Sequence, residues 1–344
     1  MSATLTETQM ELVRIAFAMS TRGVQRQREV LEGSQIPSEP TATLIRDFGG
    51  LAVSELKGGA GGALTDLLVF VESLSQAVEP TPFFVHAAAI QTSFGAGLDV
   101  RHVLESGELL TLGVMERAGQ RWGEWQLNIE ESNIEGTKIG VPFAREGGTL
   151  VAFGANNRLA LAEIRNLSRR MSLDPSMQLC DVQVSGKPLA IASNTAEATT
   201  RGALVLAAAA LGTARGSLRM ATDYATARHQ FGQPIGSFQG IAHMLSDCFV
   251  DIEAAWSLLL FAGWCFEVGE KGALSAAHGA IAKAGSTAIH VSERALQVHG
   301  GIGVTWEADP HLYIRRVLTL NALMGGPTSH YRALGAARAK GGRS

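Results

Sequence analysis

The sequence has few cysteines, few charges and few aromatic residues, and these shortages exclude several classes of protein. Three cysteines, Cys180, Cys248 and Cys265, lie far apart in 344 residues. An odd and widely spaced set predicts neither a disulfide framework nor a metal site, so we expect no metal ligands and a reducing, cytoplasmic location. Charged residues make up 18% of the chain and hydrophobic residues 46%, which indicates a globular and not a disordered protein.

A basic surface and long apolar runs are also missing. The formal net charge is −3, with both signs interspersed, whereas a nucleic-acid partner requires a clustered positive face. The most apolar stretches, 203–211 and 256–266, are shorter than the roughly 20 residues of a membrane span. The N-terminus does not have the basic and then apolar order of a targeting signal. We therefore expect no nucleic-acid partner and no membrane span.

Apolar residues recur at helical spacing in residues 1–97, which predicts an N-terminal helical domain with Val13 and Phe17 on the buried face of its first helix. This part also contains a glycine-rich segment, GGAGGA, at 58–63. Such a loop binds phosphate when a buried strand precedes it and a helix N-terminus follows it. The preceding segment is a weak strand, so the pattern favours a flexible connector.

The pattern changes twice further along the chain. Residues 98–192 carry short runs of strand-forming residues between turn signals, which predicts a middle β domain, a small antiparallel barrel or sandwich. These runs are TLGVM, WGEWQLNI, TKIGVPF, TLVAFG and CDVQV. Residues 193–344 predict a C-terminal four-helix bundle domain with a frayed tail. Its expected helices are 196–227, 238–269, 273–298 and 309–323. The predicted fold is mostly α with a middle β domain.

Two segments carry residues suited to binding a phosphorylated ligand. In the first, Tyr224 to Gln239, Arg228 stands near the end of a helix, where a guanidinium can grip phosphate with two hydrogen bonds. In the second, Ala295 to Glu307, a helix ends in Gly300–Gly301, where backbone N–H groups can approach a ligand closely. Taken singly, an arginine there commonly offsets the helix dipole, and a glycine pair commonly caps a helix.

Together, the two segments resemble the acyl-CoA dehydrogenase family, and the resemblance implies the same order of three domains. It also implies contacts with FAD, the cofactor of that family. The first segment would contact the diphosphate of a neighbouring subunit's FAD, and the second would contact the ADP portion. His299 could donate a hydrogen bond there or be a packed structural imidazole. The implied cofactor-binding residues are Arg228, Gln230, Phe231, Gln239, Gln297, Val298, His299, Gly300 and Gly301.

The chain departs from the family where catalysis is expected. Members remove the α proton of an acyl thioester with a glutamate, and Met324 occupies its position here. A second known position, before Arg201, holds Thr200, and Glu197 is the nearest substitute carboxylate. The flavin-contacting strand of the family matches 113–119, which lacks the usual Pro and hydroxyl residues. We therefore assign no catalytic residue to this chain.

This combination resembles the smaller, base-lacking subunit of heteromeric bacterial acyl-CoA dehydrogenases, which include enzymes that shorten steroid side chains. The resemblance implies an α2β2 assembly with a larger subunit, FAD at the interface, an acyl-CoA substrate and an electron-transfer flavoprotein or a similar carrier as acceptor. Two alternatives remain open. One is a self-sufficient homo-oligomeric dehydrogenase with Glu197 as a relocated base. The other is a flavin-free scaffold subunit.

Overall fold

The first third of the chain forms helices, as the apolar spacing predicts. The computed structural model describes residues 5–36 and 38–341. On α1, the buried residues include Leu12 and Ala16, whereas Phe17 is 38% exposed, so the predicted buried face of the first helix is wrong. The helices of this part are α1 (Glu7–Ser20), α2 (Gly23–Leu31), α3 (Ser38–Phe48), η1 (Glu55–Lys57), α4 (Leu64–Ser75), α5 (Phe83–Gly95) and α6 (Arg101–Ser106).

The glycine-rich segment 58–63 is a connector, but it is a structured one. Gly61 accepts a hydrogen bond from Ala52 N–H at 2.8 Å and donates its own N–H to the Val53 carbonyl at 2.8 Å. Gly59 lies so close to Val53 that an added Cβ would be 2.2 Å from its carbonyl oxygen. The glycines therefore allow the backbone to fold back on itself, which explains them without a phosphate.

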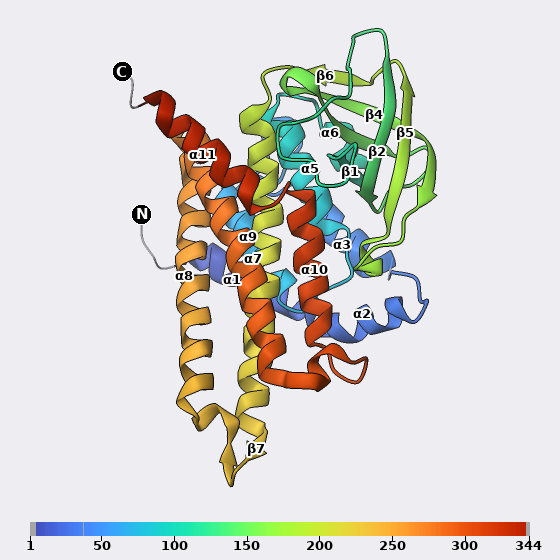
Figure 1. Cartoon of the computed structure of the whole chain (residues 1–344). Helices are drawn as coiled ribbons and strands as arrows, with labels where there is room; N and C mark the ends of the chain where they lie inside the picture. Colours follow the sequence, from blue (N-terminus) through green and yellow to red (C-terminus); the bar gives the residue numbers. More distant parts are fainter. Residues whose placement is uncertain (1–4, 37, 342–344) are drawn as a thin grey trace.

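A curled six-stranded sheet follows, in the order β1-β3-β4-β5-β2, with β6 beside β4 (Figure 1). Its pairs are antiparallel except β1 and β3, which run parallel. The predicted strand WGEWQLNI is wrong: 122–128 is a loop, and β4, the longest strand, was not predicted. The strands are β1 (Leu110–Gly113), β2 (Ile134–Pro142), β3 (Thr149–Gly154), β4 (Arg158–Arg169), β5 (Leu179–Gly186) and β6 (Ala190–Ala192).

Long helices form the rest of the described chain and stand side by side in Figure 1. Four of them match the predicted ranges within two residues, and a fifth, α11, replaces most of the predicted frayed tail. The last residues, 342–344, lie outside the described part. The helices are α7 (Ala196–Ala227), α8 (Gln239–Glu267), α9 (Ala273–His299), α10 (Pro310–Leu323) and α11 (Pro327–Gly341). The exact boundaries of the three domains, at 97 and 192, stay a prediction.

Helix α8 is longer than the apolar run 256–266 suggests, so the expectation of no membrane span cannot be based on the length of that run. The apolar run 256–266 belongs to a continuous 29-residue helix, which by length and composition alone is long enough to cross a bilayer. A third of its most apolar window, 33%, is buried in the protein, and α8 packs against α7, α9 and α4. One such helix is weak support for a span, because core helices meet the same criteria.

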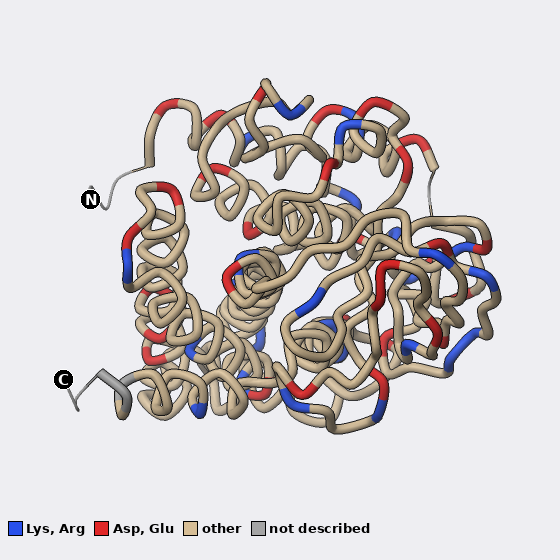
Figure 2. Tube along the Cα trace, turned by 90° about the horizontal axis from the view of Figure 1, so that it is seen from above, with Lys and Arg blue, Asp and Glu red and all other residues tan. Residues whose placement is uncertain are grey.

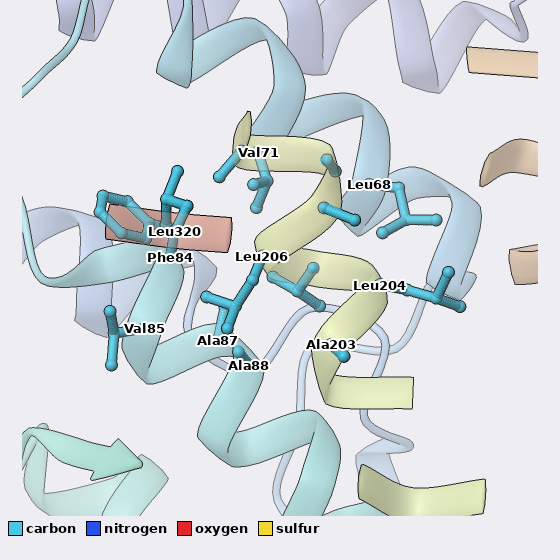
Figure 3. Packing of buried hydrophobic residues seen from close by; sticks show 14 of the residues in the cluster. Leu68, Val71, Phe84, Val85, Ala87, Ala88, Ala203, Leu204, Leu206 and Leu320 are labelled. Carbon is cyan, nitrogen blue, oxygen red and sulfur yellow. The ribbon is translucent and has the colours of Figure 1, made fainter. Parts of the chain in front are cut away.

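The core centres on α7, which runs between α4 and α5 (Figure 3). Leu204 and Leu206 on α7 are buried against Leu68 of α4 and Phe84 of α5. Glycines on α7 let the helices touch. An added Cβ at Gly216 would come within 1.9 Å of the carbonyl oxygen of Gln76, the residue that follows α4, so only glycine permits this approach.

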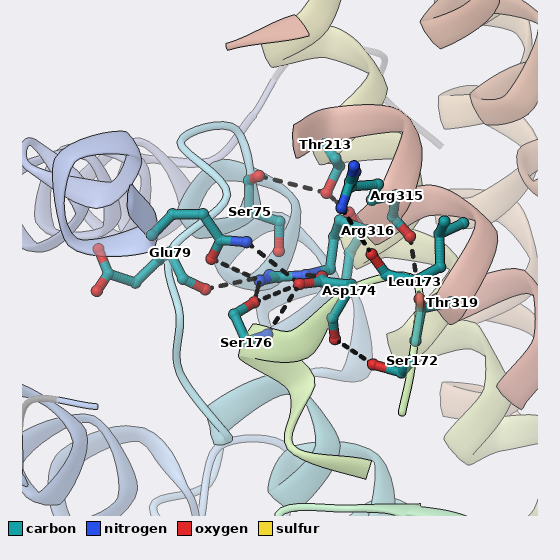
Figure 4. A network of polar contacts seen from close by, with 12 residues as sticks. Ser75, Glu79, Ser172, Leu173, Asp174, Ser176, Thr213, Arg315, Arg316 and Thr319 are labelled. Atoms are coloured by element: carbon teal, nitrogen blue, oxygen red, sulfur yellow. Dashed lines mark hydrogen bonds and ion pairs between the residues drawn. The ribbon is translucent and has the colours of Figure 1, made fainter. Parts of the chain in front are cut away.

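A buried polar network joins the three parts of the chain (Figure 4). Arg316 on α10 is 2% exposed and donates to Asp174, in the loop between β4 and β5, with Nε–Oδ2 at 2.6 Å. Its other donors reach the Glu79 carbonyl, Gln27 and Ser176. A buried guanidinium is tolerated because its donors find acceptors. The network fixes α10 against both the helices and the sheet.

Candidate functional site

The arginine segment forms the projecting tip between α7 and α8. After α7 ends at Ala227, Arg228 turns to an extended conformation, and its backbone N–H still bonds the Tyr224 carbonyl at 2.8 Å. A short hairpin follows, β7 (His229–Gln230) paired with β8 (Gln233–Pro234). The Arg228 side chain is exposed, and no described residue forms an ion pair with it. This guanidinium is available to an anion.

The hairpin turn carries an unusually placed aromatic residue. Phe231 and Gly232 both have positive φ, 53° and 84°, as tight two-residue hairpin turns require. Such a φ is unfavourable for phenylalanine. Phe231 is nevertheless 94% exposed and touches only one ring, that of Phe238, with centroids 6.1 Å apart. Nearby Gln230 and Gln239 are exposed too. The four predicted residues of this segment therefore lie together on one exposed tip.

The glycine segment ends α9. Gly300 has φ 64° and ψ −147°, a combination open only to glycine. An added Cβ at Gly300 or Gly301 would meet no atom within 4 Å, so the space above this backbone is open. A shallow cavity of about 410 Å³ lies here, and Gln297 lines it together with both glycines. The cavity offers backbone groups and an amide to a ligand, alongside one carboxylate, Glu293.

Two further predicted residues of this segment point inward. Val298 is 8% exposed and packs in a small cluster with Ala221, Ala225 and Ala295, so its side chain is not available to a ligand. His299 is 7% exposed, and its Nδ1 lies 2.7 Å from the Ala295 carbonyl oxygen. A carbonyl can only accept, so Nδ1 carries the proton and donates it. The packed-imidazole alternative describes His299, and its Nδ1–H is not free for a ligand.

Both segments lie at the same end of the bundle, opposite the β-sheet. In Figure 1 the β7–β8 hairpin projects from the lower end, and the sheet lies at the upper right. The α7 and α9 ends are held together by Tyr224, whose ring stacks on His299 with centroids 4.4 Å apart. Seen from above, basic and acidic residues are mixed over the trace (Figure 2).

A different cavity, of about 300 Å³, lies between the β-sheet and α10. Met115, Ile139 and Leu179 line it on the sheet side, and Leu318 and Leu323 line it from α10. Its remaining lining residues include one charged side chain, Arg170, and within the described chain no Asp or Glu lines it. This cavity can hold an apolar group, but it offers no carboxylate that could take a proton.

Met324, at the position expected for the base, belongs to the main hydrophobic core and is fully buried. Its carbonyl accepts a hydrogen bond from His330 Nε2 at 2.8 Å. The turn after it is packed against Trp122, because a Cβ at Gly325 would lie 2.8 Å from the Trp122 nitrogen. Burial lowers the pKa of His330 to about 4. The position is therefore filled by a packed side chain, and the sequence alone does not reveal that Trp122 packs against the turn that follows it.

The alternative base, Glu197, lies in the first turn of α7 and is exposed. The neighbouring Thr199 and Thr200 hydroxyls donate to the Ala196 carbonyl, at 3.0 and 2.7 Å. Arg201 donates to Gln91 at 2.8 Å, and burial lowers its pKa to about 10. These side chains are used in local packing. A solvent-facing carboxylate is not the desolvated base that proton abstraction from carbon favours.

Comparisons with known proteins show which family the chain is similar to. Residues 193–339 match the family model described as acyl-CoA dehydrogenase, C-terminal domain. The chain is 32% identical to acyl-CoA dehydrogenase FadE34 of Mycobacterium tuberculosis over 80% of this chain, but it spans only 38% of that relative. It is 29% identical to acyl-CoA dehydrogenase IpdE2 of the same organism, over 83% of this chain and 81% of the relative. Residues 193–339 thus match the C-terminal domain of acyl-CoA dehydrogenases, and most of the chain is similar to members of that family.

Solved acyl-CoA dehydrogenases confirm the predicted fold. A variant of the steroid ACAD named Tcur3481–Tcur3483 superposes with a TM-score of 0.80 at 25% identity, covering 99% of this chain and all of that one. Within this fold, the chain combines an exposed arginine turn and an open glycine pair with a buried methionine at position 324. Within the described chain, no group of three His, Cys, Asp or Glu side chains is placed to hold a metal.

Proposed function

We propose that this chain is the non-base-bearing subunit of a hetero-oligomeric acyl-CoA dehydrogenase, with FAD held at the interface with a larger subunit. One observation carries the proposal. The arginine turn and glycine pair face outward at the end of the bundle away from the chain's own sheet–α10 cavity (Figure 1). An FAD whose diphosphate binds at the arginine turn would therefore place its flavin ring against another chain.

The donors at the bundle end suit the diphosphate and adenosine part of FAD. An anion removed from water needs a positive charge and N–H donors. Arg228 supplies an exposed guanidinium without an ion-pair partner in the described chain. Gly300 and Gly301 leave their backbone open, since a Cβ at either would meet nothing within 4 Å. Gln297 adds a side-chain donor and acceptor beside them.

FAD supplies the electron acceptor for the reaction. Held beside Arg228 and the glycine pair, it would serve as the hydride acceptor in the conversion of an acyl-CoA thioester, whose α proton goes to a carboxylate, into its α,β-unsaturated product. In our proposal the carboxylate belongs to the larger subunit, because Met324 is buried here and Glu197 faces solvent. This chain binds and orients the diphosphate, and it excludes water from its side of the interface.

The assembly we propose is an α2β2 heterotetramer in the cytoplasm, re-oxidised by an electron-transfer flavoprotein. Similarity to the steroid ACAD makes a steroid-derived acyl thioester the first substrate to test. The exposed apolar residues of α8, among them Leu258, Phe261 and Trp264, support an assembly, because large apolar side chains gathered on one helix commonly mark an interface.

The test is the flavin content of the complete complex carrying Arg228→Ala. Removing a charge-assisted diphosphate contact should weaken FAD binding by about tenfold or more. Arg165→Ala, which removes a surface arginine on β4 paired with Glu163, is the matched control and should leave the flavin content unchanged. Unchanged flavin in Arg228→Ala would contradict the proposal and favour a flavin-free scaffold.

A further inference from the structure

A continuous chain of contacts joins the arginine turn to the glycine pair. The Arg228 N–H donates to the Tyr224 carbonyl at 2.8 Å. The Tyr224 ring stacks on the His299 imidazole, with centroids 4.4 Å apart and planes inclined by 26°. His299 is bonded through the peptide chain to Gly300. Two segments that are 70 residues apart in the sequence are thus connected by one backbone hydrogen bond and one ring stack.

His299 is held on several sides. Its Nδ1–H donates to the Ala295 carbonyl at 2.7 Å, which fixes the tautomer. Gly303 folds back over it so closely that an added Cβ would lie 3.0 Å from the His299 Cβ. Tyr224 covers a ring face. An imidazole held in this way has one orientation. Because His299 is covalently bonded to Gly300, the position of the Gly300 backbone is restricted as well.

A small hydrophobic cluster, separate from the main core, supports the same contact. Its buried members are Ala221 and Ala225 of α7 and Ala295 and Val298 of α9, and Tyr224 packs against them with residues of η4 (Ile235–Ser237) and of the start of α8. The alanines allow α7 and α9 to approach closely, because their side chains are short. This cluster lies beneath the projecting tip and anchors it.

We propose that Tyr224 and His299 form a positioning pair that sets the arginine turn at a fixed spacing from the glycine pair. The inference rests on the proposed function, since the spacing matters only if one ligand spans both. Neither residue needs to touch the ligand. A rigid spacing lowers the entropy that is lost when FAD binds, because the two halves of its site are already in place.

The experiment is a titration of the flavin-stripped complex with FAD. Tyr224→Leu, which removes the ring, should raise the FAD dissociation constant about three- to tenfold, the range expected for an aromatic pair. Tyr224→Phe keeps the ring and should restore wild-type affinity. Tyr331→Leu on α11, where the tyrosine is 48% exposed, is the matched control and should bind FAD normally. Thermal unfolding without FAD checks that each variant folds.

A double-mutant cycle separates positioning from general stability. If Tyr224 acts through the arginine turn, Tyr224→Leu should add little to the effect of Arg228→Ala on FAD affinity. Fully additive effects, or unchanged affinity in Tyr224→Leu, would overturn the positioning pair. If Arg228→Ala alone leaves the affinity unchanged, the proposed function itself fails, and the pair fails with it. The three outcomes are read from different variants and cannot be confused.

Discussion

At the residue scale, the buried Arg316–Asp174 pair is the interaction whose loss should cost the most. Both side chains are at most 2% exposed, so Arg316→Met leaves a buried carboxylate without its partner. We expect the free energy of unfolding to fall by about 3–5 kcal/mol, measured by urea denaturation. Arg14→Met, at an exposed pair with Glu11, should change it by less than about 1 kcal/mol. Equal effects of the two variants would contradict this account of the network.

His86 gives stability a defined pH dependence. It is fully buried, its Nδ1 accepts the Leu110 N–H, and its Nε2 has no partner. Burial lowers its pKa from 6.5 to about 4. The unfolded chain therefore binds a proton between pH 6.5 and 4 that the folded chain does not, so stability is full above pH 6.5 and declines as the pH falls.

We expect His86 to account for up to about 3 kcal/mol of that decline. His278 and His330, whose pKa values burial also lowers to about 4, act in the same window. His86→Asn should therefore make the decline in urea stability from pH 7 to pH 4.5 shallower without abolishing it. A decline as steep as that of the wild type would show that His86 does not titrate with folding.

At the element scale, the glycines of α7 set how closely the central helices pack. Gly216→Ala would place a Cβ 1.9 Å from the carbonyl oxygen of Gln76, at the C-terminal end of α4, so the helices must separate. We expect a loss of roughly 2 kcal/mol or more, by analogy with overpacked cores. On α9, the nearest atom to a Cβ at Gly279 is Leu334 Cδ2 at 3.6 Å. Gly279→Ala should therefore be neutral or stabilising by up to about 1 kcal/mol. The melting temperature should fall for Gly216→Ala and stay unchanged or rise for Gly279→Ala, and an unchanged value for Gly216→Ala would contradict this account of the packing.

Elements with a strong local pattern could be predicted, and those decided by distant partners could not. Helix α7 matches its predicted range, 196–227, because alanine and leucine favour helix throughout it. Strand β4 could not be predicted because it too is rich in alanine and leucine. It is a strand because it pairs with β3 and β5. The run 122–129 alternates like a strand, but Trp122 and Trp125 pack on Phe153 from a loop.

The sequence predicts which residues could form the candidate site, and this list stays a prediction, but it does not predict how the residues are arranged. Arg228 and Gly300–Gly301 stand out in the sequence because an arginine near a helix end can bind phosphate and a glycine pair leaves backbone N–H groups accessible. The contact between Tyr224 and His299 could not be read, since it depends on how α7 and α9 pack. Burial of Val298 could not be read for the same reason.

At the scale of the whole molecule, the outer face of α8 should join subunits. Phe261 is 44% exposed there. Phe261→Asp should weaken assembly with the larger subunit and lower the mass found by light scattering, because a carboxylate would be buried in an apolar contact. Phe17→Asp on α1, where the ring is 38% exposed, is the matched control. An unchanged mass for Phe261→Asp would place the interface elsewhere.

In the proposed complex, this chain supplies donors for the FAD diphosphate and the larger subunit supplies the catalytic carboxylate. Neither chain alone should therefore form the complete active site. The most direct measurement is flavin per chain, determined by absorbance for this protein alone and for its complex with a larger homologue. We expect little flavin in the isolated protein, and a flavin in the complex that bleaches when acyl-CoA is added. An isolated protein that carries stoichiometric FAD and bleaches with acyl-CoA would contradict the account and favour a self-sufficient enzyme.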